Sequence, residues 1–317
     1  MADRLGIPEV YTDHRELCSR DDLDGVTIAS PNYLHAEQSI AAFASGKNVF
    51  CEKPLALTVK EAREMLAAAE KSRMVHQVAF TYRYLDGVRE LKRRVQAGDV
   101  GEPYFIRLSH SEWRDIDTGR KSFWRGKQRY AGGGVSFDVG SHLFDLVHFI
   151  LGPIDAATGF LQSVPRRHID TETSEAVDVE TDDLASAWFR LKSGIQGQWF
   201  ASRVAPSHMG KAYVEVIGRE GALQASLSRG AVDNLRLSRP SRPEWVECEL
   251  PRGAGVTDEI PHCLTAMMQS FVESCLRGQI DEEVDATFKD GLVVQQGLAA
   301  VTESNQRSDW IRLDSAT

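Results

Sequence analysis

The chain has 317 residues, with 37 Lys and Arg against 46 Asp and Glu, so its formal net charge at pH 7 is −9. A chain of this length suggests about two domains, each able to bury a core without disulfides or metal. The negative charge argues against a general affinity for nucleic acid or an anionic membrane, because their phosphate groups repel the average surface.

Cysteine usage and the start of the chain indicate the compartment. The five cysteines are odd in number and form no C-x-x-C pair, which is typical of a reducing environment. No apolar stretch reaches the roughly 18 residues that a membrane-spanning helix needs. The segment Met1–Arg4 lacks the apolar core of a secretory signal. The sequence therefore predicts a cytoplasmic protein with no nucleic-acid or membrane partner.

The first half of the chain alternates strand-like and helix-like segments. Short apolar runs predict strands at 25–29, 48–51 and 75–80. Helices are predicted from about 32 to 45, after a Thr58–Glu61 capping box, and from about 86 to 97. Gly46 is placed to cap the first helix in the left-handed conformation. This order is typical of a parallel sheet with right-handed crossovers.

The pattern changes in the second half. A strand at 103–110 leads into a basic loop at 111–130, then a glycine run and a helix at about 137–151. Further strands with short turns are predicted at 184–191, 195–203, 211–217 and 222–227. They indicate an antiparallel meander, preceded by an acidic loop at 170–183. Helices at about 262–276 and 286–304 and a short strand at 310–313 close the chain.

The helix after the glycine run contains a candidate acid–base pair. Asp138, His142 and Asp145 are four and three residues apart, so they share one stripe beside an apolar stripe. A carboxylate one turn away orients an imidazole and raises its pKa. A solvated helix face with an i,i+4 ion pair is the competing interpretation. The residues indicate no metal site, because His148 lies about 240° round the helix from His142.

Other candidate residues follow the predicted strands. Lys53, within Glu52–Pro54, comes directly after a strand, where parallel sheets place their ligand crevice. Tyr82 follows the next strand, and Trp124 and Arg125 could supply an aromatic wall and a cationic donor from the basic loop. The competing interpretations are a surface lysine, turn packing and solvated charge. Pro54 restrains Lys53 to extended conformations and also allows a cis peptide bond.

Four motifs resemble signatures of the glucose–fructose oxidoreductase and inositol dehydrogenase family, Gfo/Idh/MocA. They are A-S-P-N-Y-L-H-A at 29–36, G-K-N-V-F-C-E-K-P-L at 46–55, G-D-V-G-E-P at 98–103 and A-G-G-G-V-S-F-D-V-G-S-H-L-F-D at 131–145. The likeness is strongest from 25 to 152. It implies an incomplete Rossmann-like parallel-sheet domain for dinucleotide binding, truncated at its N-terminus, at 1–101. It also implies an α+β domain for substrate binding and oligomerisation, with a large, mostly antiparallel open sheet, at 102–317. A C-terminal segment is expected to pack back on the first domain, and the open sheet to mediate homo-oligomers.

The resemblance also implies an activity and a site. It implies NAD(P)-dependent oxidation or reduction at a hydroxyl or carbonyl carbon of a sugar, polyol or related compound. The catalytic residues would be Lys53, Asp138 and His142, with His142 taking the proton, Asp138 supporting the imidazolium and Lys53 stabilising the alkoxide. The cofactor-binding residues would be Ser30, Pro31, Asn32, His35, Glu52, Lys53, Pro54 and Tyr82. The substrate-binding residues would be Lys53, Tyr82, Trp124, Arg125, Asp138 and His142.

The sequence departs from the family at its start. A dinucleotide site normally includes a G-x-G-x-x-G turn and a selector residue about 20 positions later, and neither is found here. The resemblance implies that on the order of 50 residues of a complete member precede Met1. We therefore expect impaired cofactor binding and no basis for choosing NAD over NADP. The alternatives are a non-catalytic binding or oligomerisation protein of the same fold and an NAD-dependent glycosidase-type relative.

Overall fold

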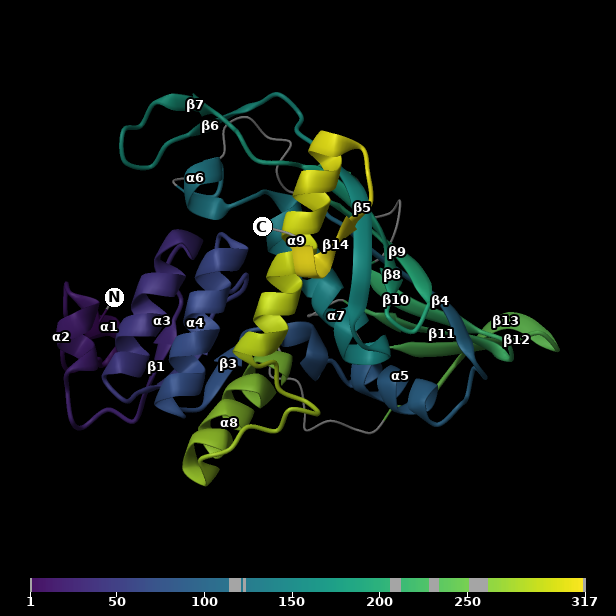
Figure 1. Ribbon diagram of the computed structural model, residues 1–317, viewed down its shortest axis with the longest axis horizontal. Helices are drawn as coiled ribbons and strands as arrows, with labels where there is room; N and C mark the ends of the chain where they lie inside the picture. Colours follow the sequence, from purple (N-terminus) through teal and green to yellow (C-terminus); the bar gives the residue numbers. More distant parts are fainter. Residues whose placement is uncertain are drawn as a thin grey trace.

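A computed structural model describes residues 2–113, 121, 124–205, 212–227, 234–250 and 262–315. Figure 1 shows a small parallel sheet with its helices beside a second, much larger sheet, with one long helix running between them. The predicted fold class, a Rossmann-like parallel sheet followed by a large mixed sheet, is confirmed. None of the described helices is long and apolar enough to cross a membrane.

The first sheet is parallel and runs in the order β1-β2-β3. Its strands are β1 (Gly25–Ile28), β2 (Asn48–Cys51) and β3 (His76–Val78). The helices of this part are α1 (Ala2–Leu5), α2 (His14–Cys18), α3 (His35–Ala44), α4 (Val59–Ser72) and α5 (Asp86–Gln96). Val49, Phe50 and Cys51 of β2 are almost fully buried, as expected for a strand that lies between two others and is covered by helices.

Local signals in the sequence set the helix boundaries here. Thr58 and Glu61 form the predicted capping box at the start of α4, which satisfies the free N–H groups of the first turn. Gly46 has φ 69° just after α3, the left-handed conformation that glycine adopts without strain. Both predictions are confirmed. The Lys53–Pro54 peptide bond is cis.

The second sheet has nine strands in the order β13-β12-β11-β10-β4-β9-β8-β5-β14. In chain order they are β4 (Pro103–Ser111), β5 (Ile154–Gln162), β8 (Leu184–Leu191), β9 (Gln196–Ser202), β10 (Tyr213–Gly218), β11 (Gly221–Ser226), β12 (Leu235–Arg239), β13 (Arg242–Glu247) and β14 (Ile311–Arg312). Every neighbouring pair is antiparallel except β4 and β9, which run parallel from Phe105↔Gln196 to Ser111↔Ser202. The sheet is therefore mostly antiparallel, as predicted.

The acidic segment 170–183 is not wholly a loop. It contains β7 (Ala176–Asp178), which pairs with β6 (Arg167–Ile169) in a separate two-stranded ribbon. The prediction of a continuous loop was wrong. The segment is acidic and mostly exposed, so it has no apolar alternation that would indicate a strand, and β7 is stabilised by backbone pairing rather than by burial. In Figure 1 this ribbon extends above α6 (Gln128–Ala131), away from the large sheet.

Three helices pack between the sheets or beside them. They are α7 (Ser141–Leu151), α8 (His262–Arg277) and α9 (Phe288–Arg307). The ring of Phe288 lies 5.5 Å from that of Phe43, and the Phe288 N–H donates to Nδ1 of His76 at 3.1 Å. Near the middle of α9, Gln295 donates to the carbonyl oxygen of Leu57 at 3.0 Å. The C-terminal segment thus contacts the first parallel-sheet domain along α9.

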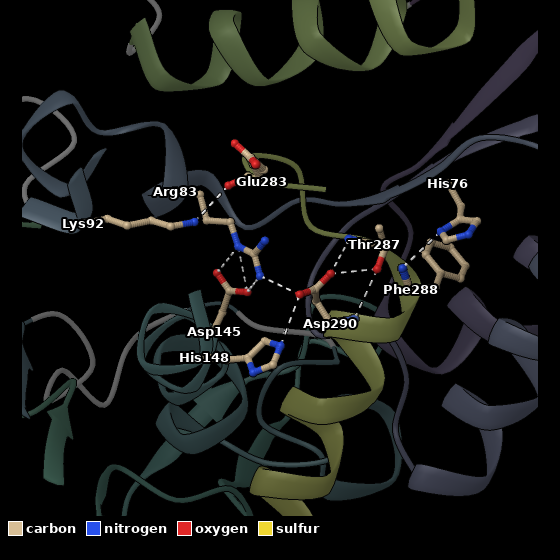
Figure 2. A network of polar contacts seen from close by, with 9 residues as sticks. All are labelled: His76, Arg83, Lys92, Asp145, His148, Glu283, Thr287, Phe288 and Asp290. Carbon is tan, nitrogen blue, oxygen red and sulfur yellow. Dashed lines mark hydrogen bonds and ion pairs between the residues drawn. The ribbon is translucent and has the colours of Figure 1, made fainter. Parts of the chain in front are cut away.

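A buried polar network joins α7 and α9 to the turn after β3 (Figure 2). Arg83 places Nε 3.0 Å from both carboxylate oxygens of Asp145, and its Nη2 lies 3.0 Å from Oδ1 of Asp290. Asp290 also lies 3.5 Å from Nε2 of His148 and accepts from the hydroxyl of Thr287. Burial opposes ionisation of Asp290, but His148 and the charge of Arg83 outweigh it and hold its pKa well below the usual range.

Candidate active site

A cavity of about 750 Å³ lies where strands β1 and β2 end. Its floor is formed by Ala29–Asn32, after β1, and by Glu52–Pro54, after β2. The opposite wall comes from the second domain and includes Trp124–Gly126, Asp138 and Arg203. The carboxyl ends of parallel strands are where open α/β sheets bind their ligands. The cavity therefore occupies the expected place for a dinucleotide and its substrate.

Lys53 and Asp138 form an ion pair inside this cavity. Nζ of Lys53 lies 2.6 Å from Oδ1 of Asp138 and donates to its backbone carbonyl at 2.8 Å. The second carboxylate oxygen lies 3.5 Å from Nη2 of Arg203. The Lys53 side chain is 17% exposed and that of Asp138 is 31% exposed, so both can reach a ligand in the cavity. The arrangement places an ammonium where it could stabilise negative charge on a ligand oxygen.

The glycine run and Asp182 position Asp138. Asp182 accepts hydrogen bonds from the Gly134 N–H at 2.7 Å and the Ser136 N–H at 2.8 Å. A Cβ on Gly134 would lie 1.8 Å from the Asp182 carbonyl oxygen, so only glycine fits there. The chain then makes one π-helical turn, Ser136–Gly140, in which Asp138 donates its N–H to the Gly134 carbonyl oxygen at 3.0 Å. This turn aims the Asp138 side chain at Lys53.

The loop after β1 is held from behind by a buried histidine. Both ring nitrogens of His35 lie 3.0 Å from a carbonyl oxygen, that of Pro54 and that of Ser30. Burial lowers the pKa of His35 below its ordinary value. Asn32 donates from its side chain to the Ala131 carbonyl oxygen at 2.9 Å, which ties this loop to the second domain. Ser30, Pro31 and Asn32 therefore line the cavity, whereas His35 fixes the loop that carries them.

His142 and Tyr82 lie together in the buried interior. Their rings are stacked with centroids 4.4 Å apart, and the ring of Phe80 meets His142 edge-on at 5.9 Å. His142 is 4% exposed and Tyr82 is 3% exposed. Neither is among the described residues that line the cavity. The structure therefore buries this aromatic pair and does not place it among the residues of the cavity surface.

Trp124 and Arg125 line the outer wall of the cavity. The guanidinium of Arg125 lies 4.3 Å from the centroid of the Trp124 ring. The wall is held by the segment after β7, because the Thr181 hydroxyl donates to the Arg125 carbonyl oxygen at 3.2 Å. Much of the predicted basic loop, residues 114–120 and 122–123, lies outside the described part of the chain.

The structure corrects the interpretation of the predicted stripe of Asp138, His142 and Asp145. Asp145 is fully buried in the ion pair with Arg83 (Figure 2), so it belongs neither to a solvated face nor to the cavity. Each turn of a helix faces a different neighbour, and here the second turn faces the segment after β3. Sequence reasoning also missed Arg203 and Asp182. Arg203 follows β9 directly, and the end of a strand was the signal that could have indicated it.

Among the described residues, no group of three or more His, Cys, Asp or Glu side chains could hold a metal ion. The cavity residues do fit the nicotinamide end of a dinucleotide. The backbone turns after β1 and β2 face the cavity, and Lys53 stands beside them with Asp138 as its counter-ion. Ser30, Pro31, Asn32 and Glu52–Pro54 are therefore the residues of this chain that would hold the cofactor there.

Comparison with known proteins places both halves of the chain. Residues 1–80 match the family model described as "Oxidoreductase family, NAD-binding Rossmann fold", and residues 88–224 match "GFO/IDH/MocA C-terminal domain". The chain is 30% identical to levoglucosan dehydrogenase of Pseudarthrobacter phenanthrenivorans, over 98% of this chain and 85% of that protein. It is 30% identical to myo-inositol 2-dehydrogenase of Thermotoga maritima, over 74% of this chain and 64% of that protein.

Solved structures give the same result. A levoglucosan dehydrogenase in complex with NADH and levoglucosan superposes with a TM-score of 0.86 at 27% identity, over 98% of this chain and 86% of that one. An oxidoreductase domain protein from Kribbella flavida superposes with a TM-score of 0.88 at 29% identity, over 98% and 86% of the two chains.

Proposed function

The chain belongs to the Gfo/Idh/MocA family of NAD-binding sugar and polyol oxidoreductases, and on this premise we propose that it oxidises a hydroxyl-bearing carbon of a sugar, polyol or related compound, or reduces the corresponding carbonyl. The observation that carries the proposal is the Lys53–Asp138 ion pair inside a cavity at the ends of β1 and β2. NAD, when bound, supplies the hydride-transfer chemistry.

Lys53 and Asp138 have complementary roles in the proposed reaction. The Lys53 ammonium donates a hydrogen bond to the reacting oxygen and stabilises the negative charge that grows on it as the proton leaves. Asp138 holds that ammonium in place at 2.6 Å. Trp124 and Arg125 contact the far side of the substrate from the outer wall.

His142 is the proposed proton acceptor. It lies one helical turn beyond Asp138, and stacking on Tyr82 fixes the plane of its ring. Asp138, one helical turn earlier in the chain, is the carboxylate proposed to support the positively charged imidazolium. Tyr82 orients the ring in this proposal.

The test is NADH formation from a panel of sugars and polyols, followed at 340 nm. Lys53→Met should lower kcat by about 100- to 1000-fold, because it removes a preorganised charge from the reacting oxygen. Lys60→Met is the matched control, since that lysine is 84% exposed on α4 and pairs with Glu64 at the surface. Full activity in Lys53→Met would contradict the proposal.

His142 is tested separately from Lys53. His142→Asn should abolish the acidic limb of the kcat/KM against pH profile, because the group that must be deprotonated is then missing. If His142→Asn loses activity but keeps the wild-type pH profile, a group other than His142 accepts the proton from the substrate.

We further propose that this 317-residue chain binds NADH and NADPH weakly. Its sequence contains no G-x-G-x-x-G turn, and that turn normally supplies the backbone N–H groups that hold the pyrophosphate. The measurement is a fluorescence titration of the folded 317-residue chain with each reduced cofactor. Micromolar binding would show that the cavity around Ser30 and Lys53 suffices to hold a dinucleotide.

A further inference from the structure

We propose that the substrate carries an acidic group, a carboxylate or a phosphate, and that Arg166 recognises it. The inference rests on the proposed function, because it names the substrate class of the same cavity.

Arg166 is a buried cation with only part of its hydrogen-bonding capacity used. It lines the cavity, and its side chain is 2% exposed. Nη1 donates to Oδ2 of Asp183 and, at 3.3 Å, to the Val164 carbonyl oxygen. Nε and Nη2 are also buried, and neither finds an acceptor in the part of the chain that the structure describes. A buried donor without an acceptor costs folding free energy, so we expect a bound ligand to supply acceptors to Nε and Nη2 of Arg166.

A second arginine in this protein, Arg83, shows the kind of group that the Nε and Nη2 donors of a buried guanidinium bind. Arg83 uses its own Nε and Nη2 to hold the carboxylate of Asp145, with Nε 3.0 Å from Oδ2 and Nη2 2.6 Å from Oδ1. The two parallel donors match the two oxygens of a carboxylate or phosphate. The same pair of nitrogens on Arg166 therefore fits an acidic group on a ligand better than a single hydroxyl.

The charge of the cavity favours an anion. Its described lining includes five cationic side chains, Lys53, Lys121, Arg125, Arg166 and Arg203, against two carboxylates, Glu52 and Asp138, and one further carboxylate, Asp183, pairs with Arg166. Asp138 is already shared by Lys53 and Arg203. The chain as a whole has a net charge of −9, so this local excess of positive charge is opposite to the average surface. Such a cavity attracts anionic ligands from solution.

The position of Arg166 assigns the acidic group to the substrate rather than to the cofactor. Arg166 precedes β6 in the second domain, and its carbonyl oxygen accepts from the Val179 N–H across the ribbon at 3.1 Å. The turns proposed to hold the cofactor follow β1 and β2 in the first domain. Figure 1 shows the β6–β7 ribbon above α6, apart from the first sheet.

The test compares acidic sugars with their neutral counterparts in a binding assay. Isothermal titration calorimetry measures D-glucuronate against D-glucose, D-galacturonate against D-galactose, and D-glucose 6-phosphate to separate phosphate from carboxylate. Arg166→Lys keeps a positive charge beside Asp183 but removes the two-donor edge. Arg167→Lys is the matched control, because Arg167 is the neighbouring residue, 62% exposed and paired with Asp178 across the ribbon.

We expect at least one acid to bind at least tenfold more tightly than its neutral counterpart. Arg166→Lys should reduce that preference by about tenfold or more, the range for a lost charge-assisted pair, and Arg167→Lys should retain it. Thermal unfolding of each variant verifies that it is folded. Equal binding of acids and neutral sugars, no binding of the acids, or a preference unchanged in Arg166→Lys would overturn the inference.

Two further readouts separate this inference from its premise. If Arg166→Lys weakens NADH binding and leaves acid binding unchanged, the arginine recognises cofactor phosphate and the inference is wrong. NADH formation is recorded independently of binding. If acids bind through Arg166 but no sugar in the panel is oxidised, the recognition site stands and the proposed oxidoreductase function fails.

Discussion

Arg83 carries a buried positive charge that is shared by two carboxylates, Asp145 and Asp290 (Figure 2). Removing one of these carboxylates should destabilise the folded protein. Asp145→Asn leaves the guanidinium, 2% exposed, with one carboxylate instead of two. We expect the free energy of unfolding to fall by about 3–5 kcal/mol, the usual cost of breaking a buried pair. Urea denaturation at pH 7 measures it.

The control is an ion pair of the same type at the surface. Glu64→Gln removes the partner of Lys60, and both side chains are well exposed on α4. That change should cost no more than about 0.5 kcal/mol. If the free energy of unfolding falls by a similar amount in the two variants, burial does not determine how much the Arg83–Asp145 pair contributes to stability.

Among single residues, the sequence indicated those that follow strands or lie in motifs. Lys53 and Asp138 were predicted as site residues, and the structure brings them within 2.6 Å of each other. Arg166 and Arg203 were not predicted: Arg203 had only the weak signal of following a strand, and Arg166, just before a short ribbon strand, had none. Their importance depends on which segments fold against the cavity, and that is not a local property.

At the scale of elements, the contact between β3 and α9 should depend on pH. Nδ1 of His76 accepts the Phe288 N–H, so protonation of that nitrogen breaks the bond. Burial lowers the pKa of His76, and Asp290 opposes the shift only in part. Because the folded pKa is below the unfolded value of about 6.5, the contribution is complete above that pH and is lost as pH falls through the folded pKa.

The corresponding variant is His76→Asn, which keeps an acceptor near the position of Nδ1 but does not titrate. Between pH 7.5 and 5, the wild-type free energy of unfolding should fall more steeply than that of His76→Asn, by at most about 1.4 kcal/mol per pH unit. Denaturant titrations at each pH measure the difference, with His262→Asn as a control for the loss of one imidazole. Parallel curves for wild type and His76→Asn would contradict the prediction.

Most helices and inner strands were predictable as elements because their signals are local. The strand predicted at 48–51 and the one predicted at 184–191 have the same bounds in the structure. The parallel pairing of β4 with β9 was not predictable, since a strand's partner and direction depend on tertiary contacts rather than on alternation. The helix predicted at about 137–151 begins instead with a π-helical turn, imposed by Asp182 from a distant segment.

At the scale of the whole molecule, the two faces of the large sheet differ. The inner face packs against helices, as Phe189 and Trp199 show by being almost fully buried beside Phe144 of α7. The outer face keeps large aromatic side chains in solvent. Trp188 is 46% exposed and Phe160 is 45% exposed. Exposed apolar groups gathered on one side of a sheet are typical of an interface between chains.

We therefore expect the protein to assemble through this face of the sheet, with Trp188 near the centre of the contact. Trp188 and Phe105 lie on neighbouring parts of the face with ring centroids 6.1 Å apart, so a partner would bury both together. Trp188→Glu places a charge there and should shift the mass measured by size-exclusion chromatography with light scattering to that of one chain. Trp310→Glu is the control, because Trp310 is similarly exposed at 47% but precedes β14 at the far edge of the sheet.

A wild-type protein that is already monomeric, or a Trp188→Glu variant of unchanged mass, would contradict assembly through this face. Loss of assembly in Trp188→Glu alone would locate the interface on β8 and its neighbours, on the opposite side of the sheet from the helices.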